Sequence, residues 1–267
     1  MQNAAALRQP TDLMFSGKRV HVWTGGTGPA LLLLHSAWGD AAMSWSPVWN
    51  DLSRSFTIIA PDLPGFGASD TPDRHMLSAT VGVLKEVLST LGAGNAVVVG
   101  NSFGAAVAIE FASTFPELTQ HLILVNGGYV PVLPGLMKKL ISIPFVEKRF
   151  RVIMRNIAYS DKALAKAFPD PSGLPAAFFH RIQQNADKHS RIVFNTFMNQ
   201  VKPQVPPTVP STIIWGTGDK LVTLKQAAMI RTWLGSAKLI PIDRAGHMPQ
   251  VDRPKEFVEV MNAVARR

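Results

Sequence analysis

A serine at the turn between a predicted strand and a predicted helix is the residue best placed for chemistry in this chain. Ser102 stands in the sequence Gly-Asn-Ser-Phe-Gly at residues 100–104. The apolar run 96–99 before it predicts a buried strand, and the small apolar residues 105–109 after it predict a helix. Glycine at both ends of the turn allows a sharp bend and close packing of strand against helix. We therefore predict that the Ser102 hydroxyl projects from the end of the strand as a nucleophile.

A nucleophilic serine needs a base, and the base needs a carboxylate that orients it. The run 212–215 predicts a second buried strand, and Asp219 follows its carboxyl end. The run 238–242 predicts a last strand, and His247 lies on the loop that follows. We predict that His247 takes the proton from Ser102 and that Asp219 holds the imidazole in the right tautomer.

Four segments of this chain are similar to segments of the α/β-hydrolase superfamily and cover nearly its whole length. They are the apolar run and histidine at 31–35, Pro-Asp-Leu-Pro-Gly-Phe-Gly-Ala-Ser at 61–69, the serine turn at 100–104 and the histidine loop at 246–250. The order serine, acid, histidine is also that of this fold. The resemblance implies an α/β fold with a central, mostly parallel sheet and helices on both faces.

The resemblance also implies a helical cap inserted after the sixth strand. The length of 267 residues suits one sizeable α/β domain together with such an insert. We expect residues 1–126 and 206–267 to form the hydrolase core and residues 127–205 to form the cap, or lid. Basic and apolar residues are interleaved between 138 and 155, which predicts amphipathic helices.

In the family that this chain resembles, backbone N–H groups form an oxyanion hole that stabilises the tetrahedral intermediate. The resemblance implies one donor at Phe103, the residue after the nucleophile. It implies a second donor on the loop after His35, which we assign to Ala37. The usual His-Gly of this loop is replaced here by His35 and Ser36, and the added Cβ constrains the backbone.

Several other polar or aromatic residues are expected to be structural. His35 is expected to shape the oxyanion loop, and Asp62 to serve as a turn residue. Asn126 ends another strand, where some relatives carry an alternative acid, but its amide has no negative charge. The remaining candidates are Asp243, too close to His247 along one loop to orient it; Asp252, expected to cap or pair near the final helix; His180 and His189, expected at the surface or in a pocket; and Met137 and Met154, expected in the core or lining a pocket.

The positive charge is concentrated in the expected cap. The chain carries 27 Lys and Arg against 18 Asp and Glu, a net charge of +9, and residues 127–210 alone hold 12 against 4. The surplus is consistent with solvated helix faces. It is also compatible with attraction of an anionic or carrier-bound ester, or with peripheral contact with a membrane surface. No motif for nucleic-acid binding accompanies the charge, so nucleic acid ranks last as a partner.

The amino-acid composition limits which structural bonds, metal sites and cellular locations are expected for this chain. The chain has no cysteine, which excludes disulfides and thiolate metal sites and fits a reducing compartment, so we expect a cytoplasmic protein. The first twenty residues contain no long apolar run of the secretory type, and no apolar stretch is long enough to span a bilayer. No metal and no organic cofactor is implied.

The combined features predict a serine hydrolase that cleaves a carboxylic ester through an acyl-enzyme. We expect Trp38, Trp45 and Trp49 to line an apolar pocket or to serve as packing. Dehalogenases and epoxide hydrolases of the superfamily use an aspartate nucleophile, and Ser102 argues against both.

Two alternatives stay open. Asn101 before the serine resembles the carbon–carbon bond hydrolases of meta-cleavage type. Those enzymes usually carry a tryptophan after the catalytic histidine, whereas this chain has Met248, and their oxyanion loop differs from residues 35–39. The second alternative is a ligand-sensing receptor with a hydrolase-like fold, because fold alone does not fix function.

Overall fold

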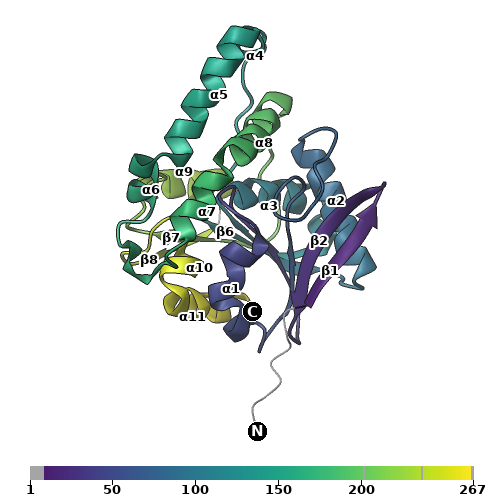
Figure 1. The fold of residues 1–267 in the computed structure, drawn as a ribbon. Helices are drawn as coiled ribbons and strands as arrows, with labels where there is room; N and C mark the ends of the chain where they lie inside the picture. Colours follow the sequence, from purple (N-terminus) through teal and green to yellow (C-terminus); the bar gives the residue numbers. More distant parts are fainter. Residues whose placement is uncertain (1–8, 201, 236, 266–267) are drawn as a thin grey trace.

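One sheet of eight strands organises the residues that the structure describes, 9–200, 202–235 and 237–265 (Figure 1). This computed structural model has the strand order β1-β2-β4-β3-β5-β6-β7-β8. The pairs β1–β2 and β2–β4 are antiparallel, and the other neighbouring strands pair parallel. The strands are β1 (Gln9–Phe15), β2 (Lys18–Gly25), β3 (Ala30–Leu34), β4 (Thr57–Pro61), β5 (Ala96–Asn101), β6 (Thr119–Val125), β7 (Ser211–Gly216) and β8 (Lys238–Ile242). The prediction of a mostly parallel sheet is confirmed.

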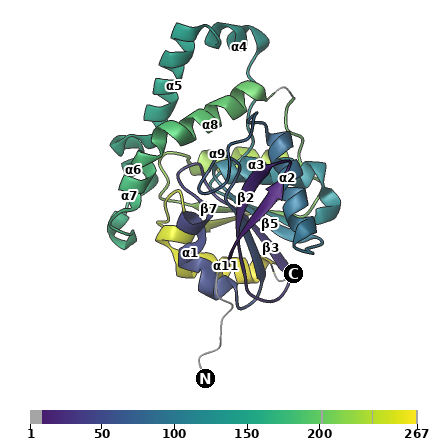
Figure 2. The same cartoon turned by 45° about the vertical axis from the view of Figure 1, so that its right-hand side comes forward.

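Helices cover both faces of the sheet, as predicted (Figure 2). One face packs against α2 (Leu77–Thr90), α3 (Phe103–Thr114) and α9 (Leu224–Leu234), and a short 3-10 helix, η1 (Pro116–Leu118), follows α3. The other face packs against α1 (Ala41–Leu52) and α11 (Pro254–Ala265), which both contact the short α10 (Pro249–Asp252).

The central strands are apolar at every position because both of their faces are buried. Side chains alternate between the faces of a strand. In β3, Leu31 and Leu33 therefore pack against α1 and α11, while Leu32 and Leu34 pack against α2 and α3. All four leucines are fully buried. A parallel strand covered on both sides thus appears in sequence as a continuous apolar run, which is how it was predicted.

A helical insertion, residues 126–210 between β6 and β7, stands over the carboxyl ends of the central strands (Figures 1 and 2). It contains α4 (Gly135–Ile141), α5 (Pro144–Tyr159), α6 (Asp161–Ala167), η2 (Pro171–Gly173), α7 (Phe178–Gln184) and α8 (Ala186–Asn199). Pro144 opens α5, where its missing N–H costs no hydrogen bond. The helices α5 and α8 pack against each other, with the rings of Phe150 and Phe194 6.0 Å apart. The first half of α5 and all of α4 project beyond the rest of the molecule.

The turn between β5 and α3 is too tight for side chains at its glycines. A Cβ on Gly100 would lie 2.2 Å from the carbonyl oxygen of Gly104, and a Cβ on Gly104 would lie 2.3 Å from that of Leu34. Ser102, at the apex, has a φ of +55°. This is a strained conformation for a residue with a Cβ, and it places the serine at the end of the sheet.

Gly100→Ala is expected to destabilise the fold by about 3 kcal/mol, because its Cβ would overlap backbone atoms that cannot move aside. The matched control is Gly82→Ala in the middle of α2, where an added Cβ meets nothing within 4 Å. That control is expected to stabilise the protein by about 0.5–1 kcal/mol. Urea unfolding of both variants measures the effect, and equal stability of the two would contradict the tight-turn account.

Candidate active site

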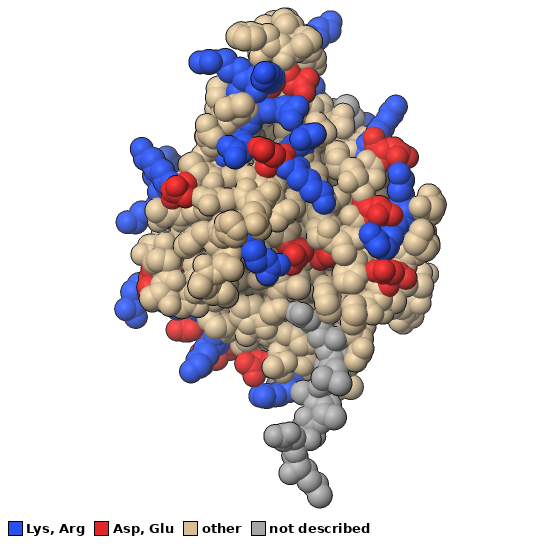
Figure 3. Space-filling model, viewed as in Figure 1, with Lys and Arg blue, Asp and Glu red and all other residues tan. Residues whose placement is uncertain are grey.

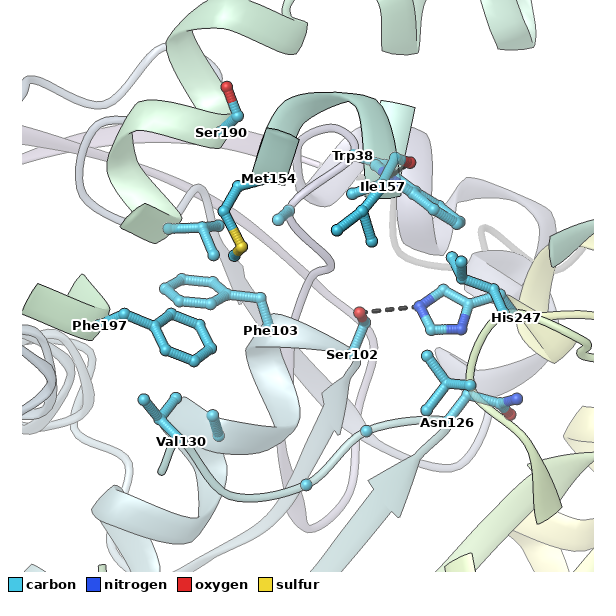
Figure 4. A pocket seen from close by; sticks show the side chains of 18 of the residues that line it. Trp38, Ser102, Phe103, Asn126, Val130, Met154, Ile157, Ser190, Phe197 and His247 are labelled. Atoms are coloured by element: carbon cyan, nitrogen blue, oxygen red, sulfur yellow. Dashed lines mark hydrogen bonds between the residues drawn. The ribbon is translucent and has the colours of Figure 1, made fainter. Parts of the chain in front are cut away.

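Three residues from distant parts of the sequence form one hydrogen-bonded chain at the carboxyl edge of the sheet. Figure 4 shows the serine and the histidine of this chain. Ser102 Oγ lies 2.8 Å from Nε2 of His247, and Nδ1 of His247 lies 2.6 Å from Oδ2 of Asp219. They come from the end of β5 and from the loops after β7 and β8. The structure thus brings together the three residues that the sequence analysis singled out as nucleophile, base and acid.

The Asp219 carboxylate sets the tautomer of the histidine. Its side chain is fully buried, and its Oδ1 accepts hydrogen bonds of 2.9 Å from the backbone N–H groups of Leu221 and Val222. An ionised carboxylate only accepts hydrogen bonds, so Nδ1 of His247 carries the proton that is donated to Asp219. Nε2 then keeps its lone pair and accepts from the Ser102 hydroxyl, which is the arrangement a general base requires.

Asn126 supports the carboxylate from the end of β6, a role that the sequence analysis did not foresee. Its Nδ2 donates to Oδ2 of Asp219 at 2.9 Å, and its Oδ1 accepts from the N–H of Gly216 at 2.9 Å. Asn126 has a φ of +41°, a conformation that asparagine tolerates better than most residues. The side chain carries no charge, as expected, but its hydrogen bond stabilises the buried carboxylate.

Asn101 connects the serine turn to the histidine loop and was also missed as a structural residue. Its Nδ2 donates to the carbonyl oxygens of Val125 and His247 at 3.0 Å each. Its Oδ1 accepts from Nε2 of Gln250 at 3.1 Å. A polar residue that ends a buried apolar strand is the signal that could have identified both asparagines, because such a residue must find partners inside the protein.

His35 fixes the orientation of one predicted oxyanion donor. Its Nδ1 donates to the carbonyl oxygen of Ser36 at 2.7 Å, and its Nε2 accepts from the N–H of Leu63 at 2.9 Å. Burial lowers the pKa of His35, which keeps the ring neutral with this pattern of donors and acceptors. The peptide bond between Ser36 and Ala37 is planar and trans, so its N–H points away from the carbonyl that His35 holds.

Phe103, the other predicted donor, is oriented in the same way. The carbonyl oxygen of Ser102 accepts from the N–H of Ala105 at 3.0 Å, so the N–H of Phe103 points in the opposite direction. Within the described part of the chain, the N–H groups of Ala37 and Phe103 have no acceptor, and both residues line the pocket that contains Ser102.

The side chain of Ser36, at the position where the resembled family usually has glycine, forms two hydrogen bonds. Its Oγ accepts from the N–H of Trp38 at 3.3 Å and donates to the sulfur of Met248 at 3.9 Å. The hydroxyl therefore joins the oxyanion loop to the residue after His247.

The end of α5 holds the loop that contains Ala37, one of the predicted oxyanion donors, through two hydrogen bonds. The Tyr159 hydroxyl donates to the carbonyl oxygen of Ala37 at 2.9 Å, and Nε1 of Trp38 donates to the carbonyl oxygen of Ala158 at 3.0 Å. Burial raises the pKa of the Tyr159 phenol, so the hydroxyl stays a donor. The ring of Trp38 also lies 4.7 Å from that of His247.

A largely apolar pocket of about 410 Å³ opens beside Ser102, between the core and the helical insertion (Figure 4). Met154 and Ile157 of α5 and Phe197 of α8 line it on the insertion side. Of the three tryptophans expected there or in packing, Trp38 lines the pocket, whereas Trp45 and Trp49 lie in the core beneath the sheet. The expectation for Met154 holds, but Met137 lies neither in the core nor in the pocket, because α4 leaves its side chain 46% exposed.

The other polar candidates form no hydrogen bond with Ser102 among the described residues. Asp62 organises a turn, since its two carboxylate oxygens accept from the N–H groups of Ala41 and Ala68 at 2.9 Å. Asp243 and His180 are exposed. His189 is buried against the ring of Phe66, and burial, with the nearby His35, lowers its pKa to about 4. Within the described residues, no group of three histidine or acidic side chains could hold a metal ion.

Asp252 has a different role from the expected cap or ion pair. Its Oδ2 accepts from the N–H of Gly246 at 2.6 Å, directly before His247. The N–H of His247 donates in turn to the carbonyl oxygen of Ala167, at the end of α6, at 2.8 Å. Asp252 and α6 therefore hold the histidine loop from both sides. Burial raises the pKa of Asp252 to about 6.

The raised pKa of Asp252 predicts a loss of stability as pH rises. Between pH 4 and pH 6 the unfolded chain has released the Asp252 proton while the folded protein retains it, so the free energy of unfolding falls across this window. We expect wild type to lose about 2–3 kcal/mol relative to Asp252→Asn between pH 4 and pH 7.

Chemical unfolding at several pH values measures this difference. The control is Asp243→Asn, at an aspartate whose side chain is 83% exposed, and its difference from wild type is expected to stay flat with pH. A flat difference for Asp252→Asn as well would contradict the assignment.

Comparisons with known proteins agree with this arrangement. A family model described as "Alpha/beta hydrolase family" matches residues 31–260. An uncharacterized protein of Mycobacterium tuberculosis is 29% identical over 261 residues, which cover 88% of this chain and 75% of that protein. A 2-hydroxy-6-oxononadienedioate/2-hydroxy-6-oxononatrienedioate hydrolase of Paraburkholderia phymatum is 27% identical, with coverage of 91% and 89%. The crystal structure of a putative lipase from Acinetobacter baumannii superimposes with a TM-score of 0.78 at 19% identity, covering 96% of this chain and 90% of the lipase.

Proposed function

This chain belongs to the α/β-hydrolase family, and on that basis we propose that it is a serine hydrolase that cleaves a carboxylic ester through an acyl-enzyme. The observation that carries the proposal is the hydrogen-bonded series Ser102–His247–Asp219, with the serine hydroxyl at the wall of an apolar pocket. Among the described residues that line this pocket there is no aspartate, glutamate, lysine or arginine.

In the proposed reaction, Ser102 Oγ attacks the ester carbonyl carbon and its proton passes to Nε2 of His247. The buried carboxylate of Asp219 stabilises the imidazolium that forms. The N–H groups of Ala37 and Phe103 donate to the developing oxyanion. When the intermediate collapses, the imidazolium gives its proton to the departing alkoxide. A water molecule, deprotonated by His247, then attacks the acyl-enzyme, and the carboxylic acid leaves as Ser102 regains its proton.

The pocket favours an ester with an apolar part. Its side chains are mostly aliphatic or aromatic, and Met154, Phe197 and Val130 extend the apolar wall away from Ser102 (Figure 4). A fatty or aryl group would bury its surface there, which is favourable by about 25 cal/mol per Å² of apolar area. We further propose that residues 127–205 act as a cap that completes this pocket over a core of residues 1–126 and 206–267.

A carbon–carbon bond hydrolase of meta-cleavage type is the second candidate. It is supported by the Paraburkholderia relative, which is named as a hydrolase of 2-hydroxy-6-oxo dienedioates and trienedioates, and by Asn101 before the serine. The substrate that this relative's name gives is a dicarboxylate. Its carboxylates would need cationic or well-placed polar partners in the pocket. Among the described lining residues there is no lysine or arginine, which favours the ester.

Ser102→Ala is expected to lower kcat for p-nitrophenyl esters by on the order of 10⁶-fold, because no other group can form the acyl-enzyme. Ser190→Ala is the matched control, since Ser190 also lines the pocket but does not contact His247, and it should keep kcat within a few fold. Ester turnover across chain lengths and labelling by a fluorophosphonate measure the effect. Labelling of Ser102 without turnover of any ester, combined with rapid cleavage of a meta-cleavage dienoate, would favour the second candidate.

His35→Leu is expected to lower kcat by about 10²–10³-fold with little change in KM, because the carbonyl of Ser36 loses its partner and the N–H of Ala37 is no longer held in place. His35→Gln keeps a donor and an acceptor in the side chain and is expected to recover part of the rate. Steady-state kinetics with a thermal melt of each variant separates this effect from misfolding. Equal kcat for wild type and the leucine variant would contradict an oxyanion donor at Ala37.

A further inference from the structure

The most projecting part of the molecule is covered by large apolar side chains. We call these side chains the apolar tip: Leu136, Met137, Leu140, Ile143, Phe145 and Val152, from α4, the turn after it and the first nine residues of α5. Each is at least 46% exposed, and Leu136 and Phe145 reach 82% and 76%. Figure 3 shows this end of the molecule as a mainly tan surface above a zone of blue side chains.

Core packing does not account for the apolar tip. The inner side of α5 already has its own apolar contacts, with Phe150 against Phe194 of α8 and with Met154 and Ile157 at the pocket. The tip residues lie on the other side of the helix or on α4. Isolated exposed apolar residues are ordinary on protein surfaces, but a contiguous group of this kind marks an interaction site.

Basic side chains surround the apolar tip without local compensation. Lys139, Lys148 and Arg149 are exposed, and within the described residues none of them forms an ion pair. The sequence has no acidic residue from 127 to 146, and the first one after that, Glu147, pairs with Arg151 at 3.6 Å. The apolar tip therefore lies in a strongly positive field.

A second basic feature lies between α5 and α8, just below the tip. It is a hollow of about 570 Å³ whose lining includes Lys148, Arg151, Arg155 and Arg191, against two acidic residues, Glu147 and Asp187. Glu147 pairs with Arg151 at 3.6 Å and Asp187 pairs with Arg155 at 2.6 Å, which leaves Lys148 and Arg191 without an ion pair among the described residues. These two side chains can bind the phosphate of a lipid headgroup through charge-assisted hydrogen bonds.

We propose that the apolar tip and its basic surroundings dock the protein on an anionic phospholipid bilayer. The apolar side chains would enter the boundary between headgroups and acyl chains, and the lysines and arginines would contact anionic headgroups. The docked protein lies at the interface only, since none of the helices in the described part of the chain is long and apolar enough to cross a membrane. Because α5 continues from the tip to the pocket, docking would hold the pocket close to the lipid.

The charge pattern favours a bilayer over a protein partner. Lysine is depleted in protein–protein interfaces, whereas here Lys138, Lys139 and Lys148 are interleaved with the apolar residues. A second copy docked by a two-fold axis would place this positive surface against itself, at a cost of several kcal/mol for juxtaposed like charges.

Vesicle co-sedimentation tests the proposal without reference to any enzymatic activity. Wild type is expected to bind vesicles of phosphatidylcholine and phosphatidylglycerol in equal parts, and to bind vesicles of phosphatidylcholine alone much more weakly. Rising salt should weaken the binding to the anionic vesicles, because the charge term is screened. No binding to the anionic vesicles, or equal binding to both kinds, would overturn the proposal.

Two double variants locate the surface. Leu136→Asp with Phe145→Asp, and Lys139→Glu with Lys148→Glu, are each expected to lower the partition coefficient by roughly 10- to 30-fold. The matched controls lie elsewhere: Leu224→Asp with Met229→Asp, and Lys225→Glu with Lys255→Glu, all at exposed positions. Equal loss in the controls would show a non-specific effect and overturn the assignment. Tip-dependent dimerisation in solution without vesicle binding would assign the surface to a second copy instead.

The absence of cysteine allows a direct measurement of insertion. Leu136→Cys gives a single thiol for an environment-sensitive fluorophore, and Met229→Cys gives the control on α9. We expect a blue shift on anionic vesicles for the label at position 136 alone. A label at 136 that stays in water while the protein sediments with vesicles would overturn the inserted geometry.

Discussion

The buried carboxylate of Asp219 is the constraint on which the rest of the site depends. A charge that is removed from water is costly unless its oxygens find donors. Here Leu221, Val222, Asn126 and His247 each donate to it, so the carboxylate accepts four hydrogen bonds inside the protein. Those donors come from three segments of the chain. Satisfying the charge therefore fixes the ends of β6 and β7 and the ring of the histidine at once.

The histidine loop forms hydrogen bonds with the helical insertion, with the end of a central strand and with a short helix that follows the loop. Ala167, in the helical insertion, accepts from the backbone N–H of His247, and Asn101, at the end of the central strand β5, donates to its carbonyl. Asp252, beneath the loop, accepts from Gly246. The insertion also supports the loop that contains Ala37, through the hydroxyl of Tyr159. Core and insertion thus share the site, and its geometry depends on how they pack together.

Local patterns in the sequence were enough to predict the fold and to single out three residues that the structure brings into one hydrogen-bonded chain. Buried parallel strands appear in the sequence as apolar runs, and the polar residues that follow three of these runs include Ser102, Asp219 and His247. The partners of Asn101 and Asn126 were out of reach, because a side-chain amide gives no sign of what it will bond across the sheet. Asp252 was assigned to a helix end because its position in the sequence gives no sign that its carboxylate accepts from the N–H of Gly246. Trp45 and Met137 illustrate a limit for apolar residues. The residue type alone does not tell whether an apolar side chain lies in the core, in a pocket or on an exposed surface, because its place depends on tertiary packing.

The φ of +55° at Ser102 has a consequence for how this scaffold changes its chemistry. The strained turn holds the Cβ of residue 102 in one place whatever the side chain beyond it, at a cost of about 1–3 kcal/mol that the tight packing of Gly100 and Gly104 sustains. Aspartate tolerates positive φ, whereas the β-branched threonine does not. The backbone at residue 102 can therefore carry an aspartate as well as a serine without being rebuilt. The turn therefore fixes the position of the Cβ of residue 102, whereas the atoms beyond that Cβ can differ between proteins that share the turn.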